Sequence, residues 1–127
     1  MKSLRAMPVV AVRDVAAAAA FWGRAGFATL GVWGDGFSIV QRGDVTFGLR
    51  KGTPVAGDWV AYVYVSDVDA LHVELSDAGL ATTGIRRNEH YGCDDFEVHD
   101  PDGQIVLFGQ ARNPHPGPGL NDDRGRG

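Results

Sequence analysis

The chain carries an internal repeat: a pattern near the N-terminus recurs 53 residues later without a gap. In each copy, a valine-rich run leads to an aspartate, an apolar stretch and then a glycine. The aspartate and glycine are Asp14 and Gly26 in the first copy, and Asp67 and Gly79 in the second. A repeat limits the fold more than any single motif, because similar sequences form similar units. It predicts two modules of the same architecture in one chain.

Each module is expected to begin with a strand followed by a helix. The strands are predicted at residues 4–12 and 59–65, and Pro8 marks the start or an edge of the first, since proline cannot donate to a ladder. The two aspartates are good N-caps, because their carboxylates accept hydrogen bonds from the free amides of the first turn. The two glycines can end the helices in the left-handed conformation.

Three further strands are predicted after each helix. They span residues 27–33, 37–42 and 45–50 in the first module, and 81–86, 95–99 and 104–109 in the second. The turn before the last strand is Asp100-Pro101-Asp102-Gly103. This order predicts an α+β fold in which two βαβββ modules form a curved half-open barrel, with helices outside and a ligand cleft on the concave face.

The modules are assigned to residues 4–50 and 59–110, within a single domain of residues 1–110. Residues 111–127 are rich in proline, glycine and polar residues, which predicts a disordered tail.

Composition excludes several classes of function. The net charge of −4 argues against nucleic acid as a partner, because phosphate binding needs a basic face. The single cysteine, Cys93, cannot form an internal disulfide. No apolar run approaches the roughly 20 residues of a membrane helix. These observations predict a cytoplasmic protein with no membrane partner.

The combined pattern resembles the vicinal-oxygen-chelate superfamily, which includes glyoxalase I, extradiol dioxygenases, thiol transferases that inactivate fosfomycin, and bleomycin-resistance proteins. The resemblance covers residues 4–110 and is strongest to the bleomycin-resistance branch. It rests on three sequence segments, in addition to the repeat and the turn: Pro8-Val9-Val10 leading to Arg13-Asp14-Val15, Phe21-Trp22, and Ala61-Tyr62-Val63-Tyr64-Val65.

Enzymes of this superfamily hold a divalent ion with four side chains from the first and last strands of each module. The resemblance and the repeat place these positions at Met7, Phe47, Val60 and Leu107. None offers an oxygen or nitrogen donor, and a thioether is a poor ligand for such ions. The four histidines, read as surface residues, do not supply a replacement set: His72, His90, His99 and His115. The chain is therefore predicted to have no metal, no cofactor and no catalytic residue.

An apolar cleft remains as the expected ligand site. Strand alternation puts Tyr62 and Tyr64 on one face if Val60 faces the cleft. The predicted ligand contacts are Phe37, Phe47, Tyr62, Tyr64, Tyr91 and Leu107, with Trp33 and Trp59 at the rim. For Phe47 and Leu107, burial in the core is an equally open alternative. The acids expected near the cleft mouth have either no role or a role toward a cationic ligand: Asp35, Glu89, Asp94, Asp95 and Glu97.

These features favour a protein that sequesters an aromatic or glycosylated antibiotic and confers self-resistance without chemistry. The resemblance implies a homodimer, with clefts between the subunits and exchange of the N-terminal strand. Two alternatives stay open: an enzyme of the lyase, thiol transferase or dioxygenase type, and a protein that binds a partner but no small ligand. The sequence does not identify the antibiotic.

Overall fold

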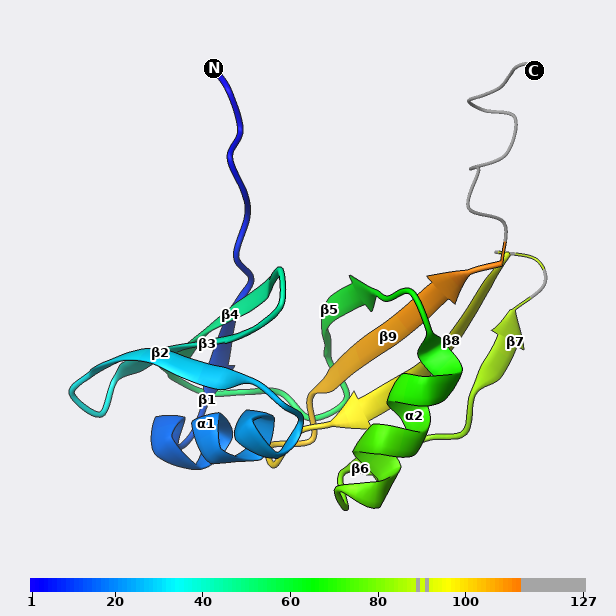
Figure 1. The fold of residues 1–127 in the computed structure, drawn as a ribbon. Helices are drawn as coiled ribbons and strands as arrows, with labels where there is room; N and C mark the ends of the chain where they lie inside the picture. Colours follow the sequence, from blue (N-terminus) through cyan, green and yellow to red (C-terminus); the bar gives the residue numbers. More distant parts are fainter. Residues whose placement is uncertain (89, 91, 113–127) are drawn as a thin grey trace.

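The computed structural model describes residues 1–88, 90 and 92–112, which form two sheets lying side by side, each with one helix (Figure 1). The first module contains β1 (Val9–Val12), α1 (Val15–Arg24), β2 (Ala28–Trp33), β3 (Phe37–Arg42) and β4 (Val45–Lys51). The second module contains β5 (Trp59–Tyr64), α2 (Val68–Asp77), β6 (Ala81–Thr82), β7 (Arg86–Asn88), β8 (Cys93–His99) and β9 (Ile105–Ala111).

The two sheets share one topology. Their strand orders are β1-β4-β3-β2 and β5-β9-β8-β6, with β7 also paired to β8. In each module the first strand runs parallel to the last, and the other pairs are antiparallel. The structure therefore confirms the α+β class and the two βαβββ-like modules.

The helix ends follow the repeated sequence signals. Asp14 Oδ1 accepts a hydrogen bond from the amide of Ala17, and Asp67 Oδ1 accepts one from the amide of Ala70, both at 3.0 Å. Gly26 and Gly79 have φ values of 88° and 81°, which favour glycine after a helix. The predicted caps are confirmed in both modules.

Three predicted boundaries need correction. The first strand begins at Val9, and the N-terminal end of the chain leads away from both sheets (Figure 1), although the Pro8 carbonyl still accepts a hydrogen bond from the Gly48 amide at 2.8 Å. The strand predicted at 81–86 is divided into β6 and β7. Between them, the Thr83 hydroxyl accepts a hydrogen bond from the Glu97 amide at 2.9 Å, so a side chain replaces part of the ladder. The last strand continues to Ala111, and residues 113–127 of the predicted tail lie outside the described residues.

Both modules contribute to one hydrophobic core, which lies between the helices and the sheets. Polar contacts also join the modules. Arg42 forms two hydrogen bonds with the Glu74 carboxylate, at 2.8 and 2.9 Å. Gln104 Nε2 donates to the Ala11 carbonyl at 2.8 Å, and the buried Asp100 carboxylate accepts from the backbone and side chain of Gln104. These contacts fix one sheet relative to the other.

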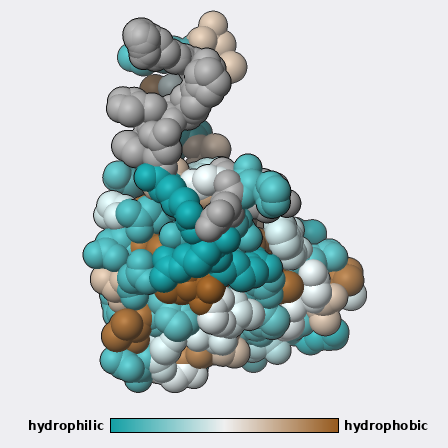
Figure 2. Space-filling model, turned by 90° about the vertical axis from the view of Figure 1, so that its right-hand side faces the viewer, coloured by the Kyte–Doolittle hydropathy of each residue, from teal (hydrophilic) through white to brown (hydrophobic). Residues whose placement is uncertain are grey.

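The side of the second module that carries α2 and β7 is mainly hydrophilic (Figure 2). Arg87 on β7 lies 2.8 Å from Asp69 and 2.9 Å from Asp94, and these hydrogen bonds raise the pKa of its guanidinium. Among the described residues, no helix is long and apolar enough to cross a membrane.

Candidate ligand-binding site

Each sheet has one face that packs on the helices and an opposite face, here called the open face. On β3, Val40 is buried in the core, while Phe37 and Ile39 point to the open face. On β5, Val63 belongs to the core, so Tyr62 and Tyr64 point the other way. The shared face predicted for Tyr62 and Tyr64 is therefore confirmed.

Two glycines shape the open face of the first sheet. A Cβ added at Gly31 would lie 2.5 Å from Cη2 of Trp33, and one added at Gly48 would lie 3.0 Å from Cζ of Phe37 and 3.1 Å from Cε of Met7. The rings of Trp33 and Phe37 therefore lie close against the sheet, with centroids 5.7 Å apart. Trp33 remains 56% exposed, so this apolar surface is accessible.

A third glycine has the same effect on the second sheet. A Cβ at Gly109 would lie 2.8 Å from Cε1 and Cζ of Tyr62, which shows that the tyrosine ring lies over this position. The Tyr64 ring follows, with its centroid 5.0 Å from that of Tyr62, and Tyr64 is 75% exposed. The two ring planes are inclined by 45°, so a flat ligand would stack on one of the rings and meet the other at an angle.

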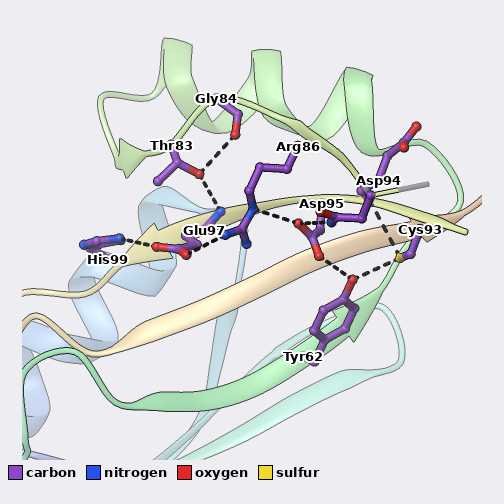
Figure 3. A network of polar contacts seen from close by, with 10 residues as sticks. Tyr62, Thr83, Gly84, Arg86, Cys93, Asp94, Asp95, Glu97 and His99 are labelled. Carbon is purple, nitrogen blue, oxygen red and sulfur yellow. Dashed lines mark hydrogen bonds and ion pairs between the residues drawn. The ribbon is translucent and has the colours of Figure 1, made fainter. Parts of the chain in front are cut away.

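A hydrogen-bond network surrounds the Tyr62 hydroxyl (Figure 3). The hydroxyl donates to Asp95 Oδ2 at 2.8 Å and lies 3.0 Å from Cys93 Sγ. Asp95 Oδ1 accepts from Arg86 Nε at 3.2 Å and from Asn88 Nδ2 at 2.9 Å. Asp95 is only 5% exposed, and these partners satisfy its carboxylate.

This network keeps Tyr62 a neutral phenol. Burial is the main cause that raises the pKa of the Tyr62 hydroxyl, and the hydrogen bonds with Cys93 and Asp95 raise this pKa further. The single hydroxyl proton goes to Asp95 Oδ2, and Cys93 Sγ is a second close polar neighbour of the phenol oxygen.

The network continues along β8 to the end of the strand. Arg86 Nη1 lies 3.3 Å from Glu97 Oε2, and His99 Nε2 lies 2.9 Å from Glu97 Oε1. The open face of the second sheet is thus polar and partly acidic, whereas that of the first is apolar and aromatic.

A hollow of about 240 Å³ lies between the two modules beside Tyr62 and Tyr64. Pro8 and Thr46 of the first module line it as well. A larger hollow of about 740 Å³ lies along α1 and the β2–β3 turn, walled mainly by small or charged residues. Tyr64 also borders a third hollow, of about 460 Å³, beside α2. We place the candidate site at the hollow of about 240 Å³, because both exposed tyrosines line it.

The position predicted for Phe47 needs correction. Phe47 is 1% exposed and lies in the core, with its ring centroid 5.3 Å from those of both Trp22 and Phe27. It faces α1, which is the core alternative that the sequence left open. Leu107 pairs with Tyr62 across β5 and β9 and shares its face, but it is also only 1% exposed. Phe47 is among the residues that border the hollow of about 240 Å³, but its side chain, like that of Leu107, is almost fully buried.

The remaining predicted contacts lie as follows. Trp59 at the start of β5 is exposed, and Phe37 is half-buried on the open face. Tyr91 and Glu89 lie outside the described residues. His72 is not the predicted surface residue: it is half-buried, and its Nε2 contacts the Thr83 carbonyl at 2.8 Å.

The acids separate into different environments. Asp35 lies 3.6 Å from Lys51 at an exposed turn. Asp94 points away from Tyr62, to the other side of β8 (Figure 3), where a hydrogen bond from Arg112 lowers its pKa. Of the predicted acids that the structure describes, only Asp95 and Glu97 join the open-face network. Within the described part of the chain, no three His, Cys, Asp or Glu residues form a group that could hold a metal ion.

Sequence reasoning missed Arg86 and Asn88, which hold Asp95. One signal was present: on β8, the polar residues Asp95 and Glu97 alternate with the apolar residues Phe96 and Val98. This alternation predicts a polar open face in the second module. It does not show which residues of β7 lie opposite.

Comparisons with solved structures identify this arrangement. The bleomycin-binding protein from bleomycin-producing Streptomyces verticillus, in complex with copper(II)-bleomycin, is 30% identical, over 85% of this chain and 96% of that one, with a TM-score of 0.72. A bleomycin resistance determinant encoded on transposon Tn5 has a TM-score of 0.75 at 20% identity, over 87% of this chain and 100% of that one. A glyoxalase-related enzyme from Clostridium phytofermentans has a TM-score of 0.76 at 19% identity, over 87% and 97%.

No family model and no curated protein matches the chain. The similarity to the Streptomyces verticillus protein nevertheless covers nearly all of both chains at 30% identity. The chain belongs to the vicinal-oxygen-chelate superfamily, which includes glyoxalases and bleomycin-resistance proteins.

Proposed function

We propose that the protein binds an antibiotic of the bleomycin type and holds it unchanged, as a sequestering resistance protein. The observation that carries the proposal is the set of aromatic rings on the open faces: Trp33, Phe37 and Tyr62 lie against glycines, and the exposed Tyr64 ring lies beside Tyr62. Exposed apolar patches of this kind are typical of binding surfaces. Two of the similar structures contain bleomycin bound to their proteins, which supports the choice of ligand class.

The proposal includes a second copy of the chain. Ligand pockets commonly enclose about 300–1,000 Å³, and the hollow of about 240 Å³ beside the tyrosines is smaller. Residues 1–6 belong to no strand of this chain and are exposed, so this arm is available for exchange with a partner subunit. A homodimer would complete the site. Light scattering should give twice the chain mass of 13.6 kDa, and a monomer would contradict this part of the proposal.

The binding site is tested by Tyr64→Ala and Trp33→Ala, with bleomycin as the probe. Each variant should weaken binding about tenfold, because central aromatic contacts are worth more than roughly 1 kcal/mol. Val73→Ala is the matched control, since Val73 is exposed and apolar but lies on α2. Calorimetric titration gives the dissociation constants, and thermal unfolding shows whether the variants fold. Unchanged affinity in both aromatic variants would contradict the site.

An enzyme is the second candidate, and one observation favours it. The Glu97 carboxylate lies 2.9 Å from His99 Nε2 on the open face, and such a pair can orient a histidine for proton transfer. The glyoxalase-related structure, at 19% identity, shows the fold alone. Recovery of a chemically altered ligand would favour this candidate over sequestration.

A further inference from the structure

We infer that Asp95 is a positioning residue that locks the Tyr62 ring as a fixed stacking plane, so that Tyr62 offers a ligand its ring face and not its hydroxyl. The inference rests on the proposed function and concerns how the same site chooses its ligand.

Three contacts restrain the Tyr62 side chain. The ring lies over Gly109, where a Cβ would collide with it. The hydroxyl donates its proton to Asp95 Oδ2 at 2.8 Å and lies 3.0 Å from Sγ of Cys93 on the same strand. Both ends of the side chain are therefore held, one by the sheet and one by β8.

Asp95 is itself held in place. It is 5% exposed, and Arg86 and Asn88 both donate to its other carboxylate oxygen. A rigid acceptor of this kind holds the phenol at one angle. Rings that are ordered before binding lose less conformational entropy when a ligand arrives.

This arrangement gives the two tyrosines different roles toward a ligand. The Tyr62 hydroxyl has no proton left to donate to a ligand. The Tyr64 hydroxyl has no hydrogen-bond partner among the described residues, and its side chain is 75% exposed. The ligand should therefore have a flat group that covers Tyr62, and a polar group placed to meet Tyr64.

The test is a double-mutant cycle with bleomycin as the probe. Tyr62→Phe removes the hydroxyl but keeps the ring, and Asp95→Asn disturbs the acceptor. Each should weaken binding roughly fivefold to tenfold, in line with the strength of a single aromatic contact. The double variant should be no weaker than either single variant, because both changes release the same ring.

Asp94→Asn is the matched control. Asp94 is the neighbouring residue on the same strand but points to the other side, where it pairs with Arg87 and Arg112. Its removal changes the net charge equally and should leave the affinity unchanged. Titrations in about 0.5 M salt, which limits charge interactions to roughly 4 Å, reduce any long-range effect of charge.

Several outcomes would overturn the inference. Additive losses would mean that Asp95 acts on the ligand independently of Tyr62. Wild-type affinity in Tyr62→Phe and Asp95→Asn, even with a lowered melting temperature, would mean that the network serves only the fold. Both results would leave the proposed function standing. Failure of the wild-type protein to bind would instead refute the proposed function, and this inference with it.

Discussion

Replacement of Phe47 by alanine should destabilise the fold and should not act through the ligand surface. The side chain is 1% exposed and contacts the rings of Trp22 and Phe27 at centroid distances of 5.3 Å. Loss of a buried phenylalanine costs about 3–5 kcal/mol, because the transfer free energy and the residual cavity add. The two ring contacts place Phe47→Ala in the upper part of that range.

The expected loss can be measured by urea unfolding at a fixed protein concentration, since a dimer makes stability depend on concentration. A loss of about 4 kcal/mol should lower the melting temperature by roughly 10–20 °C in a domain of this size. Tyr64→Ala is the control, because an exposed side chain contributes within about 0.5 kcal/mol.

One result would refute this assignment of faces. If Phe47→Ala lost less than about 1.5 kcal/mol but greatly weakened antibiotic binding, Phe47 would belong to the ligand surface. The orientation of β4 described above would then be wrong.

Two further predictions concern the second module. Gly109→Ala should push the Tyr62 ring away from Asp95 and weaken bleomycin binding about tenfold. Gly84→Ala is the control, because a Cβ there meets only open space, and it should leave the affinity unchanged. Equal affinities of the two variants in calorimetric titration would count against the position of the Tyr62 ring. Asp94→Asn should reduce the dependence of stability on acid pH. Arg112 lowers the folded-state pKa of Asp94, so its carboxylate stabilises the fold above the ordinary value of 3.8, and this contribution disappears as the pH falls through the lowered pKa. Urea unfolding between pH 2 and 5 should therefore show the wild type and the variant converging as the pH falls, and a constant difference would contradict the ion pair.

The topology could be predicted because its signals are local and occur twice. Asp14 and Asp67 cap helices through their own next turn, and Gly26 and Gly79 end them. The shared strand order then follows from placing similar sequences in similar modules. Pro8 correctly indicated where the first strand begins, although this strand is shorter than predicted.

The facing of β4 could not be predicted from the superfamily's metal positions. A shift of one residue in a strand moves every side chain to the other face. Phe47 and Leu49 are buried against α1, so the open face carries Thr46 and Gly48 instead. Alternation alone describes two faces, but only the packing of the helix shows which one is the core.

Strand alternation predicted that Tyr62 and Tyr64 share one face, and both are exposed there, as is Trp33 on the first sheet, while their contact with a ligand stays a prediction. The polar half of the candidate site depends on contacts between strands, such as the bonds from Arg86 and Asn88 to Asp95. These depend on the register of β7 against β8, and the split of the predicted strand at 81–86 changed that register. The role of Gly109 is also visible only when the neighbouring ring is seen above it.

The central claim is that the protein binds the antibiotic without altering it. The most direct test is calorimetric titration of the purified wild-type protein with bleomycin, followed by release of the ligand and measurement of its mass by mass spectrometry. The account predicts saturable binding and recovery of the antibiotic with its mass unchanged. No binding, or recovery of an altered molecule, would contradict it.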